Sequence, residues 1–140
     1  MKIREITNEK PDFYQLLGPY LANRAVHKWI GDAIWDDDGK TWLVALHPDG
    51  KVAGFCGVIT RRRRTIAESL YVTDPEDRDT AHQLMARTVK RFGHDAHLHA
   101  VVRHEHADAY TDNGFATVKE TANFATLVRR ATITQDTAHG

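Results

Sequence analysis

Histidines are the first residues in this chain whose number and spacing suggest chemistry. There are nine, and five lie between His94 and His106. His97 and His99 are two apart, so on a strand both side chains would share a face, as two ligands of a zinc or iron centre could. No acidic residue joins them at ligand spacing, so we expect no metal site. A histidine general base and plain surface histidines are the two other interpretations of the cluster.

A run of four arginines is the second unusual feature. The run consists of Arg61, Arg62, Arg63 and Arg64. Adjacent guanidinium groups repel one another unless an anion neutralises them, so a nucleic-acid backbone, another phosphate or an acidic partner could bind here. The simpler interpretation is a solvated hairpin tip that keeps a sheet edge soluble. Over the whole chain 19 basic and 19 acidic residues cancel, so no overall field attracts a polyanion.

Length and composition fit one compact cytoplasmic domain. The 140 residues suit a single core, because domains are usually about 100 to 150 residues long. Hydrophobic residues make up 41% of the chain, its mean hydropathy is −0.51, and no apolar run approaches a membrane span. Charges interrupt the N-terminus where a secretion signal would be apolar, and a single cysteine, Cys56, fits a reducing compartment.

Hydrophobic periodicity predicts the elements that must position these residues. Alternation of period two or short apolar runs predict strands, with an Asp49-Gly50 hairpin between the second and third. Apolar spacing of three and four predicts helices, most clearly from Ala81 to Phe92, with Asp74 as the cap and Gly93 as the stop. The expected strands are 2–7, 41–46, 52–60, 65–72, 97–102, one from 115 and 124–129. The other expected helices are one after Pro11 that breaks at Gly18-Pro19, one over 25–34 and one over 105–113.

This order predicts an α+β fold with a mixed, mostly antiparallel sheet flanked by about four helices. The early strands form a meander, and the helix from Ala81 connects two strands as a crossover, which requires parallel neighbours there. We expect one domain over 1–130 and a frayed tail over 131–140.

Two segments in this order resemble the GNAT superfamily of acyl-CoA-dependent N-acetyltransferases. The first is 69–78, which reads SLYVTDPEDR and leads into the amphipathic helix. The second is a Tyr-x-x-x-Gly-Phe pattern formed by Tyr110, Gly114 and Phe115. The resemblance covers nearly the whole chain. It implies acetyl-CoA as co-substrate, an amine as acceptor and a homodimer as one option for assembly.

The resemblance also implies roles for particular residues. In the family, the fourth strand pairs its backbone with the pantetheine arm, which here would involve Leu70, Tyr71 and Val72. The family's Arg-x-x-Gly-x-Gly/Ala loop binds the diphosphate, and its tyrosine protonates the departing thiolate, a role that falls to Tyr110. The loop positions here are Arg78, Thr80, Ala81, His82 and Gln83.

That loop departs from the family pattern. Both glycines are missing, with Ala81 and Gln83 in their places, although glycine lets the backbone close around phosphate oxygens. Asp77 and Asp79 also add negative charge beside the expected diphosphate. The rival interpretation is therefore a GNAT-shaped binding module that has lost the cofactor and binds an anionic or nucleic-acid partner through Arg61–Arg64.

Acyl transfer to an amine requires a base, and Glu68 is our candidate. It lies two residues before Leu70, so a regular strand would place it on the face of Ile66, Leu70 and Val72, partly desolvated. An edge charge that faces water is the alternative for Glu68, and core packing is the alternative for Tyr110.

Overall fold

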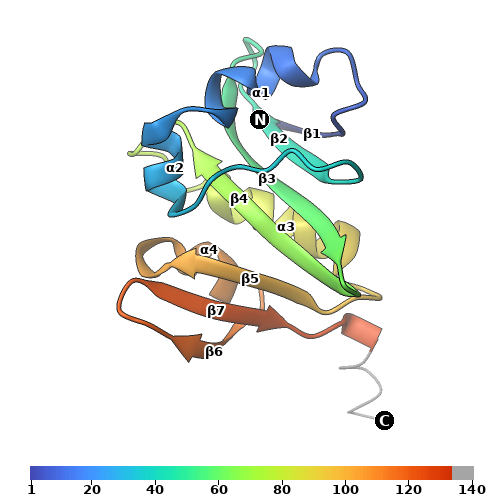
Figure 1. Cartoon of the computed structure of the whole chain (residues 1–140), viewed down its shortest axis with the longest axis vertical. Helices are drawn as coiled ribbons and strands as arrows, with labels where there is room; N and C mark the ends of the chain where they lie inside the picture. The colour runs from blue at the N-terminus through green and yellow to red at the C-terminus, as the bar shows by residue number, and fades with distance from the viewer. Residues whose placement is uncertain (134–140) are drawn as a thin grey trace.

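The computed structural model describes residues 1–133 as a seven-stranded sheet with helices on both faces (Figure 1). The strands are β1 (Lys2–Ile6), β2 (Thr41–Leu46), β3 (Val52–Arg61), β4 (Arg64–Val72), β5 (Leu98–Arg103), β6 (Ala116–Glu120) and β7 (Phe124–Arg129). The helices are α1 (Phe13–Leu21), α2 (Arg24–Ile30), α3 (Thr80–Phe92), a 3₁₀ turn η1 (His104–His106) and α4 (Asp108–Thr111). No helix among these residues is long and apolar enough to cross a membrane.

The strand order is β1-β2-β3-β4-β5-β7-β6, and only the β4–β5 pair is parallel. Helix α3 makes the crossover between these two strands, as the sequence predicts. The α+β class and the mostly antiparallel sheet are therefore confirmed.

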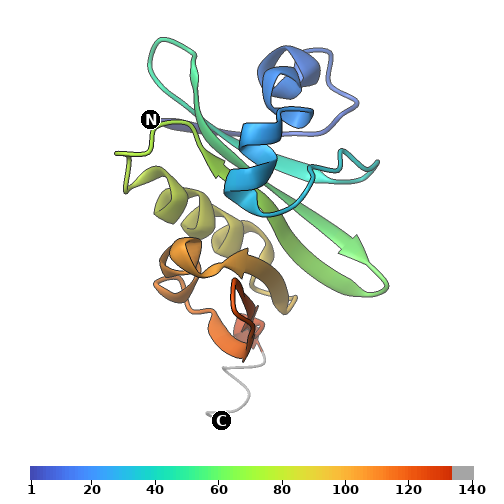
Figure 2. The ribbon, with the colours of Figure 1, turned by 60° about the vertical axis from the view of Figure 1, so that its left-hand side comes forward.

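Each face of the sheet has its own hydrophobic core. On one face, α3 packs Leu84 and Met85 against strand residues such as Leu43 and Cys56. On the other face, α1 and α2 bury a second cluster around Trp42. Figure 2 shows α3 on one side of the sheet and the two short N-terminal helices on the other. The sheet is thus held between two layers.

Some helix ends follow local sequence signals, and others differ from expectation. Asn23 caps α2, since its side-chain oxygen accepts the amides of Ala25 and Val26. Helix α3 begins at Thr80 and not after Asp74, because Asp74 and Asp77 organise a turn of their own before it. Helix α1 continues through Pro19 to Leu21, so the expected break at Gly18-Pro19 is wrong.

The segment after β7 is anchored as far as Ile133. Ala131 is buried, and the amides of Thr132 and Ile133 donate to the carbonyls of Gly93 and His94 at 3.0 and 3.1 Å. The rest of the expected tail, 134–140, lies outside the described residues.

Strands β4 and β5 pair over only two positions and then separate. Thr65 pairs with Leu98 and Ile66 with His99, after which neither strand pairs with the other within the described residues. The outer edge of each strand is still occupied, by β3 and by β7. Figure 1 shows the arrowheads of β4 and β5 well apart, with α2 beside one and α4 beside the other. Beyond Ile66, both strands therefore turn backbone edges without sheet partners toward each other.

A bulge at Ser69 decides which way the side chains of β4 point. Gly57 pairs with Glu68 and Phe55 with Tyr71, so three steps along β4 match two steps along β3. Ser69 takes the extra place with a left-handed φ of 61°. Glu68 consequently faces α2, whereas Leu70 lies in the α3 core. The expectation that Glu68 and Leu70 share a face is wrong, because the bulge reverses the alternation between them.

Candidate functional site

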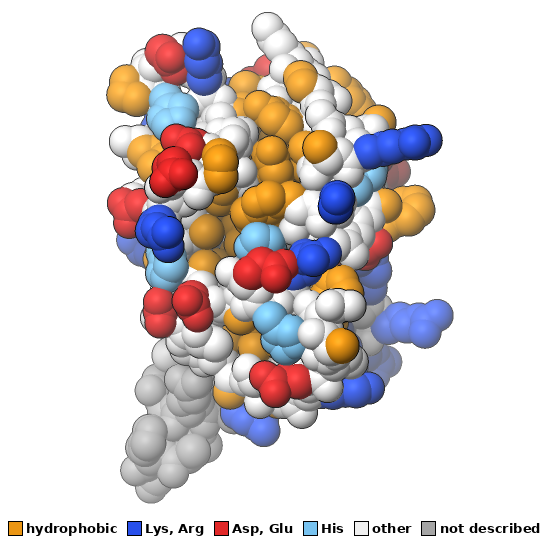
Figure 3. All heavy atoms as spheres, turned by 90° about the vertical axis from the view of Figure 1, so that its left-hand side faces the viewer, with side chains coloured by type: hydrophobic (Ala, Val, Ile, Leu, Met, Phe, Trp, Pro, Cys, Tyr) orange, Lys and Arg blue, Asp and Glu red, His pale blue; other side chains and the backbone are white. Residues whose placement is uncertain are grey.

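A cleft of about 300 Å³ opens where β4 and β5 separate, and we call it the α3 cleft. Five of the ten residues proposed from the sequence line it. They are Leu70, Val72, Arg78, Ala81 and His82. Trp29 and His106 close its other side. Figure 3 views this end of the molecule, where hydrophobic side chains form a strip flanked by acidic, basic and histidine side chains.

Three other residues expected at the cofactor site turn their side chains elsewhere. Tyr71 packs its ring against Tyr20, Phe55 and Trp29 on the α2 face. Thr80 is buried and its hydroxyl donates to Asp77, and the amide of Gln83 donates to Asp79 at 3.0 Å. None of these three residues lines the α3 cleft.

The N-terminus of α3 already holds a carboxylate. One oxygen of Asp77 accepts the backbone amides of Asp79 and Thr80 at 2.9 and 3.1 Å, and the other accepts the Thr80 hydroxyl. Burial opposes the charge on Asp77, but these three donors outweigh it and lower the pKa of the carboxyl. Asp77 thus sits where helix amides would otherwise bind an anion.

The next two amides of α3 are left for a ligand. Those of Ala81 and His82 meet no acceptor in the part of the chain that the structure describes, and both residues line the α3 cleft together with Arg78. The open edge of β4 and the apolar floor of the cleft suit the pantetheine arm of coenzyme A. The free amides and Arg78 suit the diphosphate of the same molecule. The residues present therefore fit acetyl-CoA, with Asp77 as a competing negative charge beside the diphosphate.

A second hollow lies on the other face of β4, next to α2. It consists of two pockets of about 480 and 240 Å³ that share Asp32, Glu68 and Val101, and we call it the α2 cleft. Ser69 lines the smaller pocket, and its neighbour Leu70 lines the α3 cleft. Because of the bulge, the consecutive residues Ser69 and Leu70 line two different clefts, one on each side of the strand.

Glu68 lies in the α2 cleft within a network of charges. One of its oxygens accepts from Lys40 Nζ at 3.1 Å and the other from Arg61, which also binds Asp37. The Glu68 side chain keeps 19% of its surface exposed. Its position is thus fixed by two cations, while one part of the carboxylate still faces the cleft.

Lys40 was not identified from the sequence, where it follows three aspartates and a glycine in a polar turn. The side chain has no exposed surface, and Nζ donates to Trp35 O at 2.8 Å and to Ser69 Oγ at 3.3 Å besides Glu68. Burial lowers the pKa of Lys40, although Glu68 opposes that shift. Gly57 makes room for it, since a Cβ there would lie 2.2 Å from Lys40 Cε.

Tyr110 lies inside the α3-side core. It packs edge to face on Phe115, with 5.3 Å between ring centroids, and burial raises its pKa. Its neighbours Asp108 and Ala109 line the α3 cleft, but Tyr110 is not among the lining residues. The ring thus takes the core-packing role that the sequence offers as an alternative.

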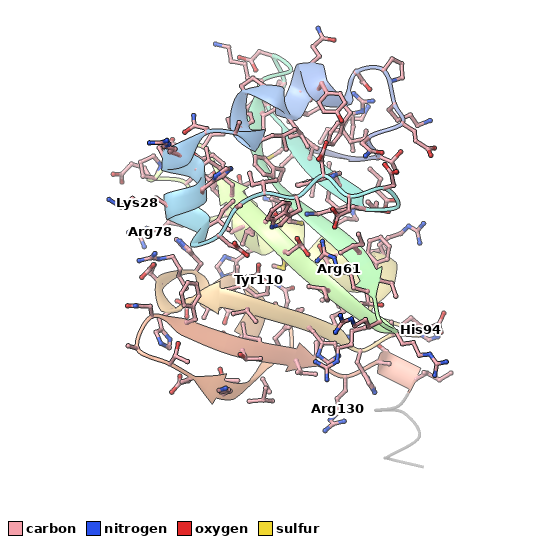
Figure 4. The ribbon with its side chains drawn as sticks, in the orientation of Figure 1. Lys28, Arg61, Arg78, His94, Tyr110 and Arg130 are labelled. Carbon is pink, nitrogen blue, oxygen red and sulfur yellow. The ribbon has the colours of Figure 1, made fainter. Side chains whose placement is uncertain are left out.

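The arginine run does not form one exposed cluster. Arg62 and Arg63 form the β3–β4 turn with φ of 50° and 67°, but Arg61 is drawn into the α2 cleft by Glu68 and Asp37. In Figure 4, Arg61 and Arg78 lie toward opposite ends of β4. The hairpin-tip interpretation therefore holds for Arg62 and Arg63, whereas two carboxylates neutralise Arg61.

The histidines are dispersed among structural hydrogen bonds. His97 accepts from the Ala131 amide, and the rings of His104 and His106 bond the carbonyls of Thr121 and Trp29. Within residues 1–133, no three His, Cys, Asp or Glu side chains gather as a metal site would require.

Comparison with known proteins finds similarity in structure and not in sequence. No protein-family model and no curated protein matches the chain. Escherichia coli ElaA superposes with a TM-score of 0.69 at 13% identity, over 93% of this chain and 100% of that one. Spermidine N-acetyltransferase from Vibrio cholerae, solved with CoA and spermine, gives 0.67 at 11% identity over 90% and 94%. Campylobacter jejuni N-acetyltransferase PseH, in complex with acetyl coenzyme A, gives 0.60 at 15% identity over 92% and 97%.

Proposed function

From the GNAT fold that these comparisons establish, we propose that the chain is an N-acyltransferase that moves an acetyl group from acetyl-CoA to a substrate amine. Direct attack within a ternary complex is the proposed route. The observation that carries the proposal is the separation of β4 and β5, with a cleft on each side of the Ser69 bulge. Two of the similar structures contain CoA or acetyl-CoA, and this supports the choice of cofactor.

The α3 cleft is the proposed cofactor site. Acetyl-CoA supplies an activated thioester there. The free backbone edge of β4 at Leu70 and Val72 would align its arm, and Arg78 with the amides of Ala81 and His82 would hold the diphosphate. Thr80 and Gln83 have no free amide to offer, because their N–H groups donate to the Asp77 carboxylate and to the Asp79 carbonyl. Holding both reactants in line provides most of the acceleration in such a reaction.

Glu68 is the proposed base. An amine must lose a proton as its nitrogen forms the new amide bond, and Glu68 faces the α2 cleft from which the amine would approach. Lys40 donates to one oxygen of the Glu68 carboxylate and Arg61 to the other, and together they fix its orientation. The sulfur leaves as a thiolate and needs a proton, for which Tyr110 is the proposed donor.

Calorimetric titration with acetyl-CoA tests the proposal. We expect binding in the micromolar range and release of free thiol when an acceptor amine is added. Glu68→Gln should lower kcat about a hundredfold with cofactor affinity intact, because the amide cannot take the proton. Unchanged turnover in this variant would remove Glu68 from the mechanism.

A GNAT-shaped module without catalysis is the second candidate, and the position of Asp77 on the α3 amides favours it. No heat of binding at millimolar acetyl-CoA would support the module. The inward position of Arg61 speaks against a nucleic-acid site built from the whole arginine run.

A further inference from the structure

Two large apolar side chains are exposed inside the α2 cleft. Trp35 keeps 57% of its surface exposed and Val101 keeps 64%, and both line the larger pocket. Exposed apolar groups in a hollow, rimmed by polar ones, mark surfaces that bind an apolar part of a ligand. The cleft therefore offers an indole and an aliphatic wall to a carbon chain.

The same cleft is short of positive charge. Its carboxylates are Asp32, Asp37 and Glu68, against Arg61 in the cleft and Lys40 behind it. Arg61 and Lys40 neutralise Asp37 and Glu68. Asp32 accepts only the amide of its neighbour Ala33 at 2.8 Å and has no ion pair within the described residues. One negative charge is left over, and it lies in both pockets of the cleft.

We infer that the acceptor is a primary alkylamine that carries a second positive charge at the far end of an apolar chain. This inference rests on the proposed function, because it takes Glu68 as the place where the reacting amine lies. The chain would lie along Val101 and the distant ammonium would meet Asp32 and the face of Trp35. The negative face of an indole ring attracts an ammonium, and the unpaired carboxylate adds to this attraction.

Three amines of equal chain length test the inference without any cofactor. Cadaverine has an ammonium at its far end, pentylamine a methyl group and aminovalerate a carboxylate. Titration of the cofactor-free protein, followed by tryptophan fluorescence and calorimetry, should give the affinity order cadaverine, pentylamine, aminovalerate. We expect cadaverine to bind about tenfold more tightly than pentylamine, with a preference that fades as salt is added.

Variants assign the preference to its residues. Asp32→Asn should remove the difference between cadaverine and pentylamine, whereas Asp95→Asn, which neutralises an exposed carboxylate outside the cleft, should preserve it. Trp35→Ala should weaken both amines. Equal binding of all three amines, or an unchanged order in Asp32→Asn, would overturn the inference. Selective cadaverine binding by a protein that does not bind acetyl-CoA would refute the transferase and leave the cation site standing.

Discussion

At the scale of single residues, Lys40 is the side chain whose burial most needs an explanation. Its charge is removed from water, and its lowered pKa means that the fold opposes the charge that it carries. Buried ion pairs often give way to apolar groups of similar volume with no loss, or with a gain of about 1–4 kcal/mol. We therefore attribute Lys40 to the orientation of Glu68 and not to stability.

Lys40→Met tests this attribution. Methionine fits the channel beside Gly57, and Glu68 keeps Arg61 as a partner and stays partly exposed, so we expect a loss of stability smaller than the roughly 3–5 kcal/mol typical of a broken buried ion pair. We expect kcat to fall at least tenfold, because Glu68 loses one of its two anchors. Thermal denaturation and steady-state kinetics measure both, with Lys40→Arg as the variant that keeps the charge. A large loss of stability with normal kcat would make Lys40 a structural residue.

Tyr110→Phe separates proton donation from packing. Phenylalanine keeps the edge-to-face contact with Phe115 and removes only the hydroxyl. If the phenol protonates the thiolate, kcat should fall about a hundredfold at an unchanged melting temperature. The raised pKa keeps the phenol protonated at neutral pH, so no pH dependence from Tyr110 is expected there. Normal turnover would assign Tyr110 to the core alone.

At the scale of elements, the sequence predicts what depends on periodicity and misses what depends on the backbone. Helix α3 and the hairpin of β2 and β3 repeat their apolar residues at regular spacing, so their apolar stretches are predicted within about two residues, although the cap of α3 is not. The bulge at Ser69 has no such signal, since a serine with positive φ looks like any other strand residue. The partners of Glu68 depend on that bulge and are therefore not predictable from strand alternation.

The start of α3 gives an element-scale prediction. Asp77 occupies two amides and adds charge beside the proposed diphosphate, so Asp77→Asn should tighten acetyl-CoA binding about three- to tenfold. The same change should lower stability by up to about 1 kcal/mol, because a charge at the helix N-terminus is lost. The affinity for acetyl-CoA measured by calorimetry should therefore rise, while the melting temperature measured by thermal denaturation should fall.

Two controls make the Asp77 prediction specific. Asp79→Asn removes an equal charge two residues away. The Asp79 carboxylate accepts from the Gln83 side chain and not from the backbone amides of α3. Acetyl-pantetheine lacks the diphosphate, so its affinity should not respond to Asp77→Asn. Equal gains in both aspartate variants would mean a general charge effect, and a gain for acetyl-pantetheine would contradict competition with the diphosphate.

At the scale of the whole molecule, one contact bridges the separated strands at the mouth of the α3 cleft. Trp29 of α2 stacks on His106 of η1, with ring centroids 3.7 Å apart, and the His106 ring bonds the Trp29 carbonyl at 2.9 Å. Helix α2 packs against β4, and η1 comes directly after β5 in the chain. The pairing between β4 and β5 themselves ends at Ile66 and His99. The width of the cleft thus depends on this stack as well as on α3.

Acid should weaken that bridge. Burial lowers the pKa of His106 below its usual 6.5, a shift that Arg103 favours and that the Trp29 carbonyl and Glu105 oppose. In the pH range between the folded and unfolded values, the unfolded chain binds more protons, so stability falls as the pH drops below about 6.5. His106→Gln should flatten the dependence of stability on pH between about pH 5 and 7. His104→Gln alters a more exposed histidine nearby and should leave the slope unchanged. Thermal denaturation over this range measures the slope, and acetyl-CoA affinity should decline with it if the stack holds the cleft at its working width. A wild-type slope in His106→Gln would mean that acid does not act on stability through His106 and its stack on Trp29.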